Sequence, residues 1–102
     1  MNFRLVTMYG EKVNEEVYSV TLPTAEGEIS VFPSHEPLVA VARDGVITVR
    51  YEKDDDDSKL EFFAISGGVI EISQKSVRVL VDEADHGDDI VERKARLRLS
   101  AR

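Results

Sequence analysis

Three short apolar runs separated by two turn-sized breaks make up the stretch Leu60–Val81, LEFFAISGGVIEISQKSVRVLV. The breaks are Gly67–Gly68 and Ser73–Ser76. Within the runs, β-branched and aromatic residues recur with a period of two, which is typical of strands that pack one face on a core. Breaks of this length join neighbouring antiparallel strands. The stretch therefore predicts three consecutive strands, with Gly67–Gly68 as a tight turn in which two backbone segments approach closely.

The same alternation continues toward the N-terminus. Strands are predicted at Val17–Leu22, Ile29–Phe32 and Val46–Tyr51, the first ended by Pro23 and the second by Pro33, because proline cannot donate to a strand ladder. Roughly eight to ten short strands at this spacing favour an antiparallel sandwich or barrel. No alternation of strands with helices is visible, so a nucleotide-binding α/β fold is not expected.

Turn residues fill the gaps between these runs. Gly27 and Gly45 are predicted to take positive φ, which glycine adopts without steric strain. The acidic segment Lys53–Lys59, KDDDDSK, is predicted to be a solvated hairpin tip. It is not interpreted as a calcium loop, because such loops place their ligands at alternate positions and end on a bidentate glutamate.

Composition excludes several classes of protein. The chain has 102 residues, enough for one hydrophobic core, and its net charge of −7 argues against binding to nucleic acid. It has no cysteine, which excludes disulfides and thiolate metal sites. No apolar run approaches the roughly 20 residues of a membrane-spanning helix, and Met1–Val6 shows no signal-peptide pattern.

Charge and periodicity change near the C-terminus. Residues 1–89 carry 8 basic and 19 acidic groups, whereas residues 90–102 carry 5 basic groups and 1 acidic group. Asp88–Asp89 is suited to cap a helix, since negative charge is favourable at a helix N-terminus. The sequence therefore predicts a β domain over residues 1–85 and the start of a C-terminal helical segment over residues 86–102.

The residues suited to acid–base or metal chemistry are few. His35 lies in a predicted loop between Pro33 and Pro37, and His86 lies in an acidic turn that is predicted to be exposed. Neither has further ligands at metal-binding spacing, and no phosphate-loop or nucleophile-elbow pattern occurs. We expect no catalytic, cofactor or metal site, and interpret the chain as a binding or structural component rather than an enzyme.

Three segments, taken in order, resemble the epsilon subunits of F-type ATP synthases (the delta/epsilon family). Ser19–Val31, SVTLPTAEGEISV, is similar to the family's V-T-L-P-x-x-E-G-E-x-x-V stretch. Pro33–Leu38 is similar to its P-G-H-x-P-L loop, and Phe63–Ile72 to its F-x-V-x-G-G-x-x-E-V hairpin. The resemblance covers residues 3 to about 95. It implies a flattened antiparallel β-sandwich of about ten strands, followed by C-terminal helices.

The resemblance also implies a function. Epsilon subunits belong to the central stalk, where the sandwich binds the gamma subunit and touches the polar loops of the membrane c-ring during proton-coupled ATP synthesis. Such a subunit would lie at the cytoplasmic face of the bacterial plasma membrane, peripheral through the complex. By position, the c-ring-facing residues would be Glu26, Gly27 and Glu28, and the gamma-facing residues would be His35, Pro37 and Leu38.

Two departures from the family pattern alter these expectations. In the family, the helical tail reaches into the alpha/beta head, inhibits ATP hydrolysis and in some bacteria binds ATP. In Ile90–Ala95, Val91 replaces the aspartate of the nucleotide motif and Lys94 its arginine, so ATP binding is not expected here. Ser34 stands where the loop usually has glycine, which predicts a turn with negative φ.

An alternative remains open. A stand-alone β-sandwich that binds a peptide or a carbohydrate would have a similar strand pattern. Carbohydrate modules usually expose aromatic platforms, and this chain has no Trp and three Tyr, which disfavours that ligand.

Overall fold

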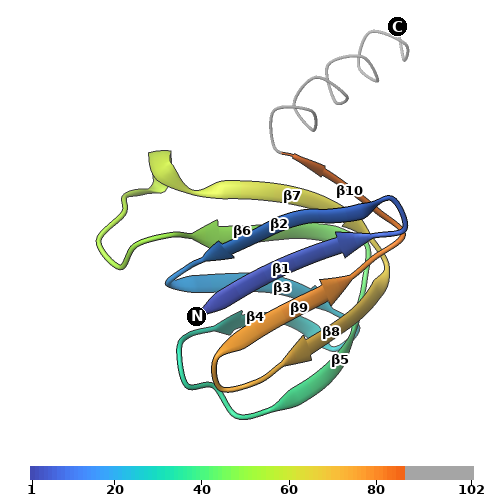
Figure 1. Ribbon diagram of the computed structural model, residues 1–102, viewed down its shortest axis with the longest axis horizontal. Helices are drawn as coiled ribbons and strands as arrows, with labels where there is room; N and C mark the ends of the chain where they lie inside the picture. Colours follow the sequence, from blue (N-terminus) through green and yellow to red (C-terminus); the bar gives the residue numbers. More distant parts are fainter. Residues whose placement is uncertain (87–102) are drawn as a thin grey trace, which may run out of the picture.

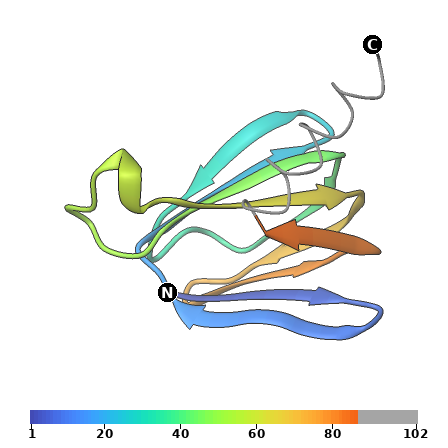
Figure 2. The ribbon, with the colours of Figure 1, turned by 90° about the horizontal axis from the view of Figure 1, so that it is seen from above.

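The computed structural model describes residues 1–86, which form a β-sandwich of two layers (Figures 1 and 2). One layer contains, in spatial order, β2 (Gly10–Glu16), β1 (Asn2–Thr7), β9 (Ser76–Leu80), β8 (Gly68–Ile72) and β5 (Leu38–Ala42). The other contains β4 (Gly27–Val31), β3 (Ser19–Thr24), β6 (Gly45–Arg50), β7 (Glu61–Ser66) and β10 (Glu83–His86). The layers are joined where Thr24 of β3 pairs with Ala42 of β5.

The predicted sandwich of about ten strands is thereby confirmed. Its ladders in the described part are antiparallel except for one, because β1 and β9 pair in parallel from Asn2↔Ser76 to Val6↔Leu80. The predicted helical segment, residues 86–102, lies outside the described residues apart from His86, and so does the Ile90–Ala95 motif.

The core lies between the layers and follows the period of two seen in the sequence. In β6, Ile47 and Val49 are buried while Val46 and Thr48 face outward. Side chains with no exposed surface come from both layers, among them Phe3, Leu5, Leu22, Ile47 and Ile70. Burying an apolar side chain of this size contributes roughly 1.5–3 kcal/mol, which makes this shared core the main source of stability.

The strands predicted in Leu60–Val81 are confirmed as β7, β8 and β9. Gly67 has φ 48° and Gly68 has φ 137°, so the turn between β7 and β8 uses backbone conformations that favour glycine. A Cβ at position 68 would collide with the carbonyl oxygen of Leu80 and lie 3.0 Å from the Cα of Val81. The predicted close approach of two backbones is therefore confirmed.

Pro23 does not end its strand, and that prediction is wrong. The residue is buried inside β3, opposite Glu28 of β4. It lies where β3 leaves β6 and joins β5, so its missing N–H falls at a break in the ladder, and its carbonyl accepts a bond from the Arg43 N–H at 3.1 Å. Sequence alone did not show that β3 changes neighbours at this residue.

The prediction that Gly45 takes a positive φ is also wrong. Gly27 has φ 123°, as expected, but Gly45 is not among the glycines with positive φ. A Cβ at position 45 would lie 2.9 Å from the Cβ of Pro23, so this glycine is required by packing rather than by its own φ.

The aspartate run forms the exposed connection between β6 and β7, as predicted. Asp56 caps a single 3-10 turn, η1 (Asp57–Lys59), by accepting the Ser58 N–H at 3.0 Å. This hydrogen bonding to Ser58 lowers the pKa of the Asp56 carboxyl. Arg50 at the end of β6 anchors the loop, donating to the Asp55 carbonyl and lying 3.7 Å from the Asp57 carboxylate.

Candidate partner-binding surfaces

The β3–β4 turn, predicted to face a c-ring, is held rigidly by one threonine. The Thr24 hydroxyl donates to the Gly27 carbonyl at 2.5 Å and accepts the Glu26 N–H at 3.2 Å. Thr24 itself is buried, whereas Glu26 and Glu28 are exposed. The turn therefore presents two carboxylates on a fixed backbone.

A second turn, between β1 and β2, repeats this construction. The Thr7 hydroxyl donates to the Gly10 carbonyl at 3.3 Å and accepts the Tyr9 N–H at 3.1 Å, and Gly10 has φ 121°. Its tip carries Met8 and Tyr9, which are 75% and 87% exposed. The sequence signal was available, since Thr-x-x-Gly-Glu occurs at residues 7–11 and again at residues 24–28.

The β4–β5 loop carries the residues predicted to face a gamma subunit. The Ser34 N–H donates to the Gln74 carbonyl at 3.1 Å, which fastens the loop to the β8–β9 turn. His35 is half-buried, and its Nδ1 lies 2.6 Å from the Glu36 carbonyl oxygen. Pro37 and Leu38 are exposed.

Ser34 has φ 69°, so the prediction of a negative φ at this position is wrong. The loop keeps the left-handed conformation that a glycine would favour, because the hydrogen bond to Gln74 fixes its direction. The serine backbone therefore holds a strained conformation that a glycine would adopt without strain.

Ser34→Gly is accordingly expected to stabilise the chain slightly. Relief of a left-handed conformation is worth about 1–2 kcal/mol, and glycine's greater freedom in the unfolded chain offsets about 0.5–1 kcal/mol. Urea unfolding should show a net gain of about 0.5 kcal/mol. Ser34→Ala is the control and should show no gain; a clear loss in Ser34→Gly would contradict the strain.

The structure does not bring the two predicted surfaces together. The β3–β4 turn lies at the same end of the sandwich as the β1–β2 turn, whereas the β4–β5 loop lies at the opposite end with the β8–β9 turn (Figures 1 and 2). β4 runs between them. Their assignment to particular partners stays a prediction.

An apolar row on the outer face of one layer was missed by sequence analysis. Val41, Val69, Leu80 and Val6 are register partners in succession across β5, β8, β9 and β1. Val41 is 61% exposed. The row arises from the register of four strands that are distant in sequence, so no local pattern reveals it. Exposed apolar rows of this kind mark surfaces that contact other proteins.

Ion pairs lie next to this row on the same face. Arg4 meets Glu11 at 2.7 Å, and Arg78 meets Glu71 at 2.8 Å. The hydrogen bond from Arg4 lowers the pKa of the Glu11 carboxyl. Each pair crosses between neighbouring strands, where opposite charges support the ladder.

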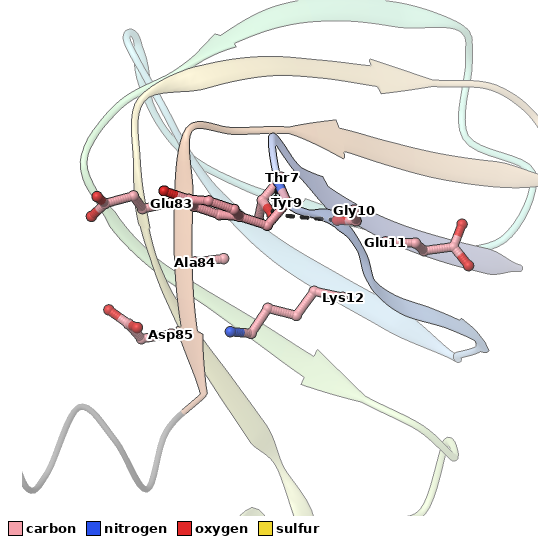
Figure 3. Close-up of a pocket in the computed structure, with 8 residues that line it drawn as sticks. All are labelled: Thr7, Tyr9, Gly10, Glu11, Lys12, Glu83, Ala84 and Asp85. Atoms are coloured by element: carbon pink, nitrogen blue, oxygen red, sulfur yellow. Dashed lines mark hydrogen bonds between the residues drawn. The ribbon is translucent and has the colours of Figure 1, made fainter.

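A hollow of about 670 Å³ lies at the seam between the β1–β2 turn and β10 (Figure 3). It is lined mainly by polar groups, including Tyr9, Lys12, Glu83 and Asp85. Figure 3 shows the Lys12 side chain directed toward β10. Among residues 1–86, no cluster of three His, Cys, Asp or Glu is arranged to hold a metal ion. The hollow is therefore a gap between two sheet edges.

His86 does not lie in an exposed turn, and that prediction is wrong. It is the last residue of β10, pairs with Phe63 of β7 and packs its ring at 5.3 Å from that phenyl ring. Its Nε2 lies 3.5 Å from the Glu61 carboxylate, to which the Tyr51 hydroxyl donates at 2.9 Å. Burial and the bond to Glu61 raise the pKa of Tyr51, so the hydroxyl stays protonated as a donor. Tyr51, Glu61 and His86 thus connect the end of β6, β7 and β10 within one layer.

Comparison with known proteins places the chain in a family. Residues 1–87 match the family described as ATP synthase, Delta/Epsilon chain, beta-sandwich domain. The chain belongs to the ATP synthase delta/epsilon family. The resemblance seen in the sequence is thus confirmed, and no helix in residues 1–86 is long and apolar enough to cross a membrane.

Relatives within the family are named as epsilon chains. The chain is 38% identical over 87 residues to the ATP synthase epsilon chain of Desulfitobacterium hafniense strain Y51, covering 85% of this chain and 62% of that one. It is 33% identical over 95 residues to the epsilon chain of Herminiimonas arsenicoxydans, covering 93% and 66%. The chain therefore spans about three fifths of the length of the first of these relatives.

A solved structure agrees with this assignment. A chain in the Euglena gracilis mitochondrial ATP synthase, from an assembly of OSCP, F1 and c-ring, superposes with a TM-score of 0.79 at 27% identity. The match covers 97% of this chain and 61% of that one. A chain of the Tetrahymena thermophila mitochondrial central stalk and c-ring, at 19% identity and a TM-score of 0.66, shares the fold.

Proposed function

We propose that the chain is a non-catalytic rotor subunit that links a gamma subunit to the c-ring of a proton-translocating F-type ATP synthase. The observation that supports this most directly is the family match over residues 1–87, together with the rigid acidic turn at Glu26–Glu28. The two relatives named above as epsilon chains come from bacteria. On that basis the proposed location is the cytoplasmic face of the plasma membrane, peripheral through the complex.

The geometry suits a protein that transmits force without doing chemistry. A linker needs a stiff body and contact surfaces whose shape does not change under load. The sandwich supplies the body, and the Thr24 hydrogen bonds fix the turn that would meet the ring. The acidic charge of Glu26 and Glu28 suits basic loops on the partner, mainly by setting orientation and association rate.

The β4–β5 loop supplies the second proposed contact. His35, Pro37 and Leu38 lie at the other end of β4 from the acidic turn, so two partners could be engaged at once. The apolar row on the outer face, from Val41 to Val6, is a further surface available to gamma. A subunit held at both ends and along one face would turn with the rotor as a rigid piece.

Glu28→Lys is expected to weaken binding to purified c-ring about tenfold, or about 1.4 kcal/mol, because it replaces attraction by like-charge repulsion. Its unfolding midpoint should not change, since the side chain is exposed. Binding would be measured by surface-immobilised c-ring titration, with Asp54→Lys in the β6–β7 loop as the matched charge reversal. Equal binding by wild type and Glu28→Lys would remove the turn from the interface.

A further inference from the structure

β4 has one free edge. Among the described strands it pairs with β3 alone and lies off the path that connects the other nine. The two strands at the ends of that path, β2 and β10, are protected in the ways that natural sheets use. β2 has four charged residues among its seven and contains a register shift at Lys12, which is skipped between the pairs Leu5↔Val13 and Val6↔Glu11. β10 has four residues, of which Glu83 and Asp85 are acidic.

The backbone groups that face this edge follow from the turn. Thr24 and Gly27 are the last paired residues before the two-residue turn, which makes them a hydrogen-bonded pair. Pairs in an antiparallel ladder alternate, so Leu22–Ile29 is also hydrogen-bonded and Thr21–Ser30 is not. The Thr21 and Ser30 hydroxyls lie 3.1 Å apart, as expected for the closer, non-bonded pair. The N–H and C=O of Glu28 and Ser30 therefore point away from β3.

Two exposed apolar residues follow β4 in the chain. Phe32 follows β4 directly and is 49% exposed, and Leu38 begins β5 at 42% exposed. β4 also connects the two proposed partner contacts, with Glu26–Glu28 at its start and the His35–Leu38 loop beyond its end. An added strand would find open backbone groups along β4, a carboxylate at the start of the strand and the exposed Phe32 just beyond its end.

We propose that the free edge of β4 is a strand-addition site that takes an extended, basic segment of a partner protein as the next strand of the sheet. Main-chain bonds to Glu28 and Ser30 would supply affinity, and Glu26 and Glu28 would select positive charge. A second copy of this chain is a poorer occupant, because it brings the same carboxylates and the same net charge of −7. The inference rests on the proposed function only for the identity of the partner, a rotor subunit.

Ser30→Pro tests the edge directly. Proline removes the Ser30 N–H and places its ring at the free edge, yet the bonds between β3 and β4 are untouched because that N–H does not face β3. Ser30→Ala is the matched control, since both variants lose the hydroxyl contact with Thr21. Both should unfold at the same urea midpoint, which shows that the fold is retained.

The probes are purified gamma subunit and c-ring from the same genome. Ser30→Pro should lower the affinity of the subunit that binds wild type at least tenfold, while Ser30→Ala stays within twofold. In that complex the Glu28 and Ser30 amides should exchange hydrogen at least tenfold more slowly than in the free chain. Unchanged affinity of Ser30→Pro, or unchanged exchange at both amides, would overturn the inference and leave the proposed function standing.

Two other outcomes are decisive as well. If wild type binds neither rotor subunit, the proposed function fails; the edge is then judged with a synthetic ten-residue peptide of alternating lysine and valine. Saturable binding of that peptide that Ser30→Pro abolishes would support the edge, and no binding would overturn it. A dimer of this chain that Ser30→Pro dissociates, seen by light scattering, would overturn the choice of partner.

Discussion

Gly68→Ala is expected to lower the free energy of unfolding by about 3–5 kcal/mol, a loss that approaches the whole stability of many small domains. Two causes act together. At φ 137° an L side chain is strained, and the added Cβ would run into the Leu80 carbonyl and the Val81 backbone. Backbone atoms of a central strand cannot move aside without breaking the β8–β9 ladder. Urea unfolding followed by circular dichroism would measure the loss.

Gly67→Ala is the matched control one residue away. Its φ of 48° lies in the left-handed helical region, and the nearest atom to an added Cβ is the Asp44 carboxylate at 3.9 Å. A cost of about 1–2 kcal/mol is expected from conformation alone. If the two variants lost similar amounts of unfolding free energy, the close backbone approach at Gly68 would not be the cause of the larger expected loss.

Much of the fold followed from local pattern, and the errors share one origin. Alternation placed the strands of Leu60–Val81, because a period of two is imposed by each strand's own inner and outer faces. Pro23, Ser34 and His86 were misjudged because their conformations depend on distant neighbours: a change of ladder partner, a bond to Gln74, and pairing with Phe63. These partners are distant in the sequence, so a local pattern cannot predict them.

The candidate surfaces divide in the same way. The acidic turn was found by its resemblance to a family stretch, and its Thr-x-x-Gly construction accounts for its rigidity. The Val41–Val6 row and the free edge of β4 were not found, because both depend on which strands become neighbours. Surfaces of this kind can be identified only when the order and register of the strands are known, and local sequence patterns do not give either.

The sandwich's proposed role depends on stiffness, and stiffness depends on the core shared by its layers. A contact surface on one layer keeps its place relative to the other only if side chains from both interlock between them. Phe3 is suited to test this, since it is fully buried on β1, between Glu15 of β2 and Val77 of β9. Phe3 belongs to the parallel ladder between β1 and β9.

Phe3→Ala is expected to cost about 3–5 kcal/mol, from the lost burial of the ring and the cavity left behind. Phe62→Ala removes the same atoms from the outer face of β7, where the residue is 39% exposed, and should cost about 1–2 kcal/mol, because only part of the ring is buried. Thermal and urea unfolding of both variants would give the two values. Comparable losses would contradict a core placed between the layers, whereas a large difference would show that the rigidity of the proposed contact surfaces comes from inside the sandwich.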